Sequence, residues 1–128
     1  MKVLLDTHVL VWLGHRSSRL GADRQLVEEA DRRLVSAVCV WELAIKQRLG
    51  KLSVGSDVRT WTRRVTTELV LEHLPVTADH AAAVEHLPAV HRDLFDRLLV
   101  AQAVAEGAVL LTADHRLVEY GDAVRLVG

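Results

Sequence analysis

KVLLDTH, residues 2–8, decides the fold, because it joins an apolar run to an acid and a helix start. A short continuous apolar run such as Lys2 to Leu5 is typical of a parallel strand buried on both faces. Asp6 or Thr7 is a suitable N-cap for a helix that we predict from Thr7 to Leu13. A strand, an acid and a helix in direct succession indicate an α/β protein.

The same alternation continues to the end of the chain. We predict further strands over residues 34–36, 69–74, 108–111 and 124–127. We predict further helices over residues 22–33, over 37–49 before Gly50, after a cap at Ser56, from the Thr77 cap to about 86, over 94–106 between Asp93 and Gly107, and after Asp114. Strands alternating with helices predict a three-layer α/β/α sandwich over a mainly parallel five-stranded sheet, formed by one domain spanning residues 1–128.

Composition sets modest limits on function. Half of the residues are hydrophobic, about a quarter are charged and the net charge is −1, which argues neither for nor against nucleic acid. The apolar stretches are far shorter than the ~20 residues of a membrane span, and no signal peptide is readable. Cys39 is the single cysteine, so no internal disulfide is possible, and we expect it to be a small buried residue. We expect a soluble cytoplasmic protein with no membrane partner.

Four acids lie where a folding chain disfavours them. Asp6 and Asp114 close apolar strands, and Glu42 and Asp96 lie on the apolar stripes of two predicted helices. Ionised carboxylates are among the residues least often buried unless they are paired or bind metal. Each acid alone has an ordinary alternative: an N-cap for Asp6 and Asp114, a surface pair with Lys46 for Glu42, and a charge near a helix N-terminus for Asp96.

Together the four acids indicate a metal site. In open parallel sheets ligands bind beyond the carboxyl ends of the strands, where Asp6 and Asp114 are predicted to lie. Apart from Lys46, the apolar stripes carry no Lys or Arg to neutralise the acids. Carboxylate oxygens without a Cys or His set favour Mg²⁺, Mn²⁺ or Ca²⁺ over zinc. We therefore expect one or two Mg²⁺ or Mn²⁺ ions.

Polar residues near the four acids are weaker candidates. Seven histidines are present without a zinc spacing, and we interpret His8 and His91 as pocket-rim residues and the others as surface or loop residues. Hydroxyl groups that could orient a water or a ligand belong to Thr7, Ser36 and Thr112. Side chains that could contact a phosphate, or else be solvated surface charge, belong to Lys46, Arg92 and Arg97. Aromatic residues are scarce, which argues against a platform for stacking bases.

Four segments of the chain resemble the PIN-domain ribonucleases, and among these most closely the VapC toxins of bacterial toxin–antitoxin pairs. They are LLDTH at residues 4–8, SAVCVWELAIK at 36–46, HRDLFDRLLVAQA at 91–103 and LTAD at 111–114. The resemblance spans nearly the whole chain in order. Leu94 stands where many relatives carry Pro, a change that removes no ligand.

The resemblance implies a fold, an activity and partners. The sheet order would be 3-2-1-4-5, and the metal-binding acids would be Asp6, Glu42, Asp96 and Asp114. The protein would be a metal-dependent endoribonuclease that cleaves RNA, neutralised by a cognate antitoxin protein. A homodimer is also implied; segments near Trp12 and Trp61 could contribute to it, although we favour a core role for them. Two alternatives stay open: a catalytically silent module holding a structural ion, and a nuclease directed to DNA.

Overall fold

Five short strands form one sheet in the computed structural model, which describes residues 1–89 and 93–128. The strands are β1 (Lys2–Leu5), β2 (Arg32–Ser36), β3 (Glu72–Leu74), β4 (Val109–Thr112) and β5 (Val124–Leu126). Their order is β3-β2-β1-β4-β5, and every neighbouring pair is parallel. The predicted order is confirmed. The expected mainly parallel sheet is wholly parallel across the described strands.

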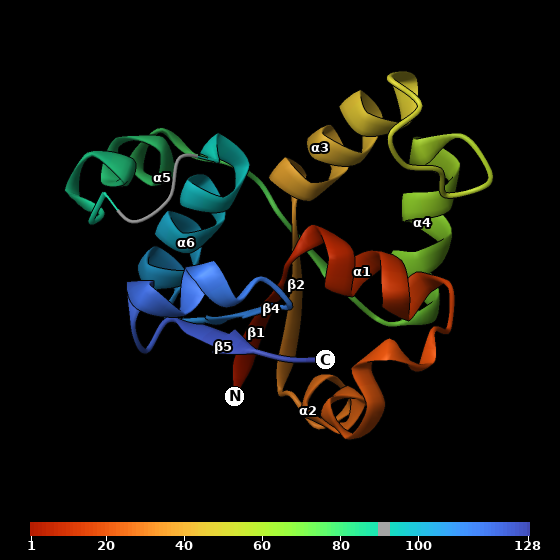
Figure 1. Ribbon diagram of the computed structural model, residues 1–128, viewed down its shortest axis with the longest axis horizontal. Helices are drawn as coiled ribbons and strands as arrows, with labels where there is room; N and C mark the ends of the chain where they lie inside the picture. Colours follow the sequence, from red (N-terminus) through yellow and green to blue (C-terminus); the bar gives the residue numbers. More distant parts are fainter. Residues whose placement is uncertain (90–92) are drawn as a thin grey trace.

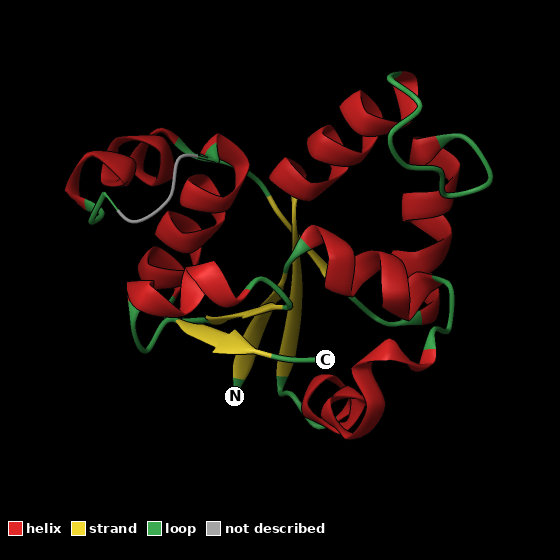
Figure 2. Ribbon diagram, in the orientation of Figure 1, coloured by secondary structure: helices red, strands yellow, loops and turns green. Residues whose placement is uncertain are grey.

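Helices cover both faces of this sheet. They are α1 (Thr7–Gly14), α2 (Arg24–Glu28), α3 (Ala37–Arg48), α4 (Val58–Glu68), α5 (Ala78–Ala83) and α6 (Leu94–Glu106), with 3₁₀ helices η1 (Ser18–Asp23), η2 (Val84–His86) and η3 (His115–Tyr120). Because parallel crossovers are right-handed, the reversal of direction after β3 sends α5 and α6 to the face opposite α1 and α4. Figures 1 and 2 show this division, which confirms the expected three layers.

Side-chain caps begin the helices that carry the candidate residues. Asp6 caps α1, Ser36 caps α3 and Asp93 caps α6, each accepting a bond from a backbone N–H of the first turn. Gly107 ends α6 with φ of 62°, a left-handed conformation that glycine adopts without strain. The predicted bounds of α6 are therefore confirmed. Asp57, rather than the predicted Ser56, caps α4.

Two predicted elements are wrong in extent. The helix expected over residues 22–33 is only α2, because the 3₁₀ segment η1, kinked at Gly21 with φ of 53°, precedes it and β2 begins at Arg32. At the start of β2, the Arg32 guanidinium donates two bonds of 2.9 Å to Glu72 on the edge strand β3. The strand expected over residues 69–74 is shortened to β3, because Val70 takes φ of 52° in the turn that follows α4.

The core lies on both faces of β1 and β4. Leu4, Leu5, Leu110 and Leu111 are fully buried, as a strand covered by helices on both sides requires. Trp61 of α4 is also buried, and it packs so closely on α1 that a Cβ at position 14 would lie 2.5 Å from its ring. The core role favoured for Trp61 is confirmed.

Two residues outside the sheet bear on the expectations for function. Cys39 is buried, and burial raises the pKa of its thiol, so it is unsuited to act as a nucleophile. Trp12 is partly buried, with the Arg19 guanidinium 5.6 Å from its ring centroid. Across the described ranges, no helix is long and apolar enough to cross a membrane.

Candidate active site

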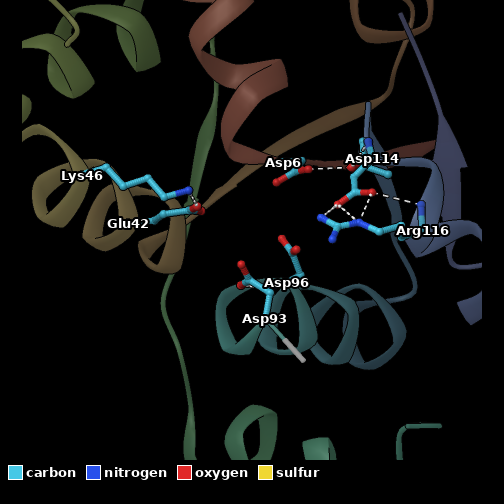
Figure 3. A network of polar contacts seen from close by, with 8 residues as sticks. Asp6, Glu42, Lys46, Asp93, Asp96, Asp114 and Arg116 are labelled. Carbon is cyan, nitrogen blue, oxygen red and sulfur yellow. Dashed lines mark hydrogen bonds and ion pairs between the residues drawn. The ribbon is translucent and has the colours of Figure 1, made fainter. Parts of the chain in front are cut away.

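The four predicted acids line one pocket of about 430 Å³ beyond the carboxyl ends of β1 and β4. The other residues that line it are His8, Lys46, Asp93, Ala113, His115 and Arg116. Figure 3 shows Asp6 and Asp114 facing Asp96 across this space, with Glu42 at its other side. Four acids that are distant in the sequence therefore line a common pocket.

Asp6 is held between a helix start and the neighbouring strand. Its Oδ1 accepts a bond of 2.7 Å from the Thr7 backbone N–H, and its Oδ2 accepts one of 2.5 Å from the Thr112 hydroxyl. Burial raises the pKa of the Asp6 carboxyl, and the charge of Glu42 adds to the rise, against the lowering effect of the two hydrogen bonds. Two hydrogen bonds thus fix the Asp6 carboxylate at a buried position where its ionised form is disfavoured.

Glu42 faces the pocket from the first half of α3. Its carboxylate is buried, with Oε1 accepting a bond of 2.6 Å from the Thr7 hydroxyl and Oε2 accepting one of 2.5 Å from the Lys46 ammonium. This hydrogen bond raises the pKa of Lys46. The pair with Lys46 therefore exists, but it lies inside the pocket wall and not on the open surface as the alternative required.

Thr7 and Thr112 were expected to orient a water or a ligand. In the structure each hydroxyl donates to a carboxylate instead: Thr7 to Glu42 and Thr112 to Asp6. Both threonines are buried at strand or helix ends, where the backbone fixes them. They act on the pocket by positioning acids.

The first turn of α6 contributes two acids to the pocket. Asp93 accepts a bond of 3.1 Å from the Asp96 backbone N–H, which fixes the start of the helix. Both side chains line the pocket, and Figure 3 shows them rising from α6 toward Asp6 and Asp114. Sequence reasoning assigned Asp93 only the capping role and missed it as a pocket residue. The three-residue spacing, which places both side chains on one helix face, was the available signal.

Asp114 carries a basic partner that the sequence analysis did not expect. Both of its oxygens accept bonds from the Arg116 guanidinium, at 3.0 Å from Nε to Oδ1 and 2.7 Å from Nη2 to Oδ2. Hydrogen bonding to Asp114 raises the pKa of Arg116. The sequence analysis looked for neutralising basic residues only in the apolar stripes and therefore missed Arg116, which lies in η3.

The pocket has the donor chemistry of a hard-cation site, although its acids do not converge on one point. Within residues 1–89 and 93–128, no group of three Asp, Glu, His or Cys side chains is close enough to hold a metal ion as placed. Five carboxylates nevertheless share the pocket with two basic side chains. Carboxylate oxygens with excess negative charge fit Mg²⁺ or Mn²⁺ in their chemistry, and the acidic side chains would have to move closer together to hold the ion.

The structure places other predicted residues away from the pocket. Arg97 donates to the carbonyls of Pro88 and Val84 and to the Tyr120 hydroxyl, so it ties α6 to the preceding loop. Ser36 donates a bond of 2.5 Å to the buried Gln102. The predicted residues Arg92 and His91 lie outside the described part of the chain.

The structure tests the sequence interpretation for three of the seven histidines. His8 lines the pocket, as predicted. His115 also lines it, although the residue is exposed, as expected for a surface position. His80 is buried, so its assignment as a surface residue is wrong. It completes the capping box of α5 with Thr77, and its Nε2 lies 3.0 Å from a carboxylate oxygen of Glu106. The Thr-x-x-His spacing was a capping signal that the sequence analysis did not use.

Asp6→Asn is expected to stabilise the fold at neutral pH. The folded-state pKa of Asp6 is raised, so its contribution to the free energy of unfolding is fully present below the unfolded pKa. That contribution is lost as pH rises through the folded pKa. Asn removes the buried charge, and we expect Tm at pH 7 to rise by roughly 3–6 °C, with the gain shrinking toward pH 4.

Thermal unfolding followed by circular dichroism between pH 4 and 8, with metal chelated, measures this effect. The exposed Asp122→Asn serves as a control for loss of charge alone. A gain in Tm that is the same at all pH values, or a loss at pH 7, would contradict a raised pKa at Asp6.

Comparison with known proteins agrees with the fold. Residues 3–123 match the PIN domain family. The chain belongs to this family. As a PIN domain it is similar to ribonuclease VapC22 of Mycobacterium tuberculosis, with 32% identity over 117 residues that cover 90% of this chain and 88% of that protein. Its fold is similar to a chain of the crystal structure of VapBC2 from Rickettsia felis bound to a DNA fragment from its promoter. That match has a TM-score of 0.72 and 16% identity, covering 98% of this chain and 97% of the other.

Proposed function

We propose that this PIN-domain protein is a metal-dependent endoribonuclease that cleaves RNA phosphodiester bonds and acts as a toxin. The observation that carries the proposal is the gathering of Asp6, Glu42, Asp96 and Asp114 around one pocket from four separate segments. The similarity to a protein named a ribonuclease supports the reaction class.

The chain's residues fit one or two Mg²⁺ or Mn²⁺ ions. Such an ion would lower the pKa of a bound water and offset the charge that develops on phosphate oxygens. Asp6 and Asp96 would be direct ligands, because both face the centre of the pocket. Asp114 would be a third ligand, and Glu42 would act through water.

Substrate positioning falls to residues on the pocket rim. The Lys46 ammonium lies at the edge of the pocket, half-buried, and can approach a phosphate of the strand without reading its sequence. His8 and His115 line the same pocket and can donate hydrogen bonds to the RNA backbone. Thr7 and Thr112 keep the carboxylates of Glu42 and Asp6 in place.

A cognate antitoxin is the proposed partner. The protein of similar fold is one component of a complex, VapBC2, that was crystallised on promoter DNA. An active ribonuclease would harm the cell that makes it, which supports a neutralising partner. A homodimer and a cytoplasmic location remain predictions.

Turnover on matched nucleic acids tests the proposal against its two rivals. With Mn²⁺ present, we expect internal cleavage of a labelled single-stranded RNA and at least about 100-fold slower cleavage of DNA of the same sequence. Because the preferred site is unknown, a mixed RNA pool whose new ends are mapped is the better substrate. Absence of any new RNA end would favour the silent module, and faster cleavage of DNA would favour the DNA-directed nuclease.

A further inference from the structure

Arg116 covers one of the acids that the proposed reaction needs. Its guanidinium contacts both oxygens of Asp114, while its backbone N–H donates a separate bond of 3.0 Å to Oδ1. A planar guanidinium placed in this way occupies lone pairs of both carboxylate oxygens. A cation cannot take Asp114 as a full ligand until part of this contact opens.

The contact is built so that it can open without unfolding. The Arg116 side chain is 62% exposed, whereas that of Asp114 is 22% exposed. The backbone bond from Arg116 to Asp114 caps η3 and does not depend on the guanidinium. Rotation of one exposed side chain therefore removes the guanidinium from Oδ2 and leaves the cap in place. An exposed ion pair contributes little stability, so a dication can compete with it.

We propose that Arg116 is a displaceable counter-ion, held on Asp114 until a divalent cation binds and then released to contact a phosphate of the RNA. This inference rests on the proposed function and assigns a role in it to one more residue. Arg116 lines the same pocket, so the released guanidinium remains beside the metal ligands. Its planar fork matches phosphate oxygens, and it stays charged at any working pH.

Lys46 is less suited to the same exchange. Its partner Glu42 is 6% exposed and is also fixed by the Thr7 hydroxyl, so the pair lies deeper in the wall. The two basic residues would therefore differ in function, with Lys46 as a fixed charge and Arg116 as a movable one.

Direct measurement of Mn²⁺ binding tests the first half of this proposal. Free Mn²⁺ is followed by electron paramagnetic resonance during titration of the wild type, Arg116→Ala and Arg116→Lys. We expect Kd for Mn²⁺ to fall about three- to tenfold in Arg116→Ala and less in Arg116→Lys, which keeps the charge without the planar fork. The matched control is Arg64→Ala, which removes an exposed arginine paired with Glu68 on α4 and should leave Kd unchanged.

Kinetics on RNA test the second half. We expect Arg116→Ala to raise KM for RNA about three- to tenfold and to reduce the slope of log KM against log salt by about 0.7, the contribution of one phosphate contact on a single strand. Equal Kd for Mn²⁺ in the wild type and Arg116→Ala would overturn the counter-ion role. Tighter Mn²⁺ binding with unchanged KM would overturn the phosphate role.

Two further outcomes distinguish failure of the Arg116 role from failure of the proposed function. If none of the variants nor the wild type binds Mn²⁺, the proposed function fails and this inference fails with it. If Arg116→Ala lowers Tm by several degrees and leaves Kd for Mn²⁺ unchanged, the Arg116 side chain only stabilises the fold, and only this inference is lost.

Discussion

Asp96→Asn is expected to lower kcat/KM on RNA by more than about 100-fold while leaving the fold intact. Loss of a residue that only holds a metal ligand in place already lowers metal affinity or activity about 10–100-fold, so loss of a direct ligand should lower activity more. Asn is of equal size and keeps one carbonyl oxygen. Asp93 still caps α6 through the Asp96 backbone N–H, which the substitution does not change. The helix should therefore form as before.

Asp79→Asn is the matched control for Asp96→Asn. Asp79 lies in the first turn of α5, is exposed and does not line the acidic pocket. Both substitutions remove a negative charge near a helix N-terminus, which is worth only about 0.3–1 kcal/mol at the surface. Kinetics and Tm of the two variants should be measured side by side. Cleavage by Asp96→Asn at the rate of the control would refute the role of Asp96.

Removal of divalent cations is expected to abolish RNA cleavage entirely. Without a cation, the pocket offers five carboxylates that repel a phosphate and no strong Lewis acid to activate water. EDTA followed by dialysis should reduce the rate to background. Mg²⁺ or Mn²⁺ should restore it, because carboxylate oxygens suit these cations.

The same cations should stabilise the wild-type fold. A ligand that binds only the folded state adds about 2.7 kcal/mol at 100 times its Kd. We expect saturating Mn²⁺ to raise Tm of the wild type and to have little effect on Asp6→Asn, which loses a ligand. Cleavage that persists in EDTA, at the rate seen with Mg²⁺, would show that the reaction needs no metal.

The strand and helix order was predictable from the sequence because the local signals agree with the global fold. The apolar runs at β1 and β4 have the length of buried parallel strands, and Asp93 and Gly107 mark both ends of α6. Where the chain takes a left-handed turn at Val70, a residue type that disfavours it, the prediction failed. The sheet order required the family resemblance.

The acids of the site were predictable because a charged residue is conspicuous in an apolar pattern, and in the structure Asp6 and Glu42 are buried while Asp96 and Asp114 are half-buried. The partners of those acids were not. Arg116 lies two residues from Asp114 in a turn, a spacing that the periodicity of helices and strands does not test. Asp93 was hidden by its second role as a cap. Both residues belong to the pocket only because separate segments meet there.

Diffraction from crystals soaked in Mn²⁺, recorded for its anomalous signal, tests most directly whether the acidic pocket binds a divalent cation. We predict a peak within about 2.0–2.6 Å of oxygens of Asp6 and Asp96. The guanidinium of Arg116 should then have moved off Oδ2 of Asp114. A pocket without any peak at saturating Mn²⁺, with the four acids placed as described, would contradict the metal-dependent mechanism.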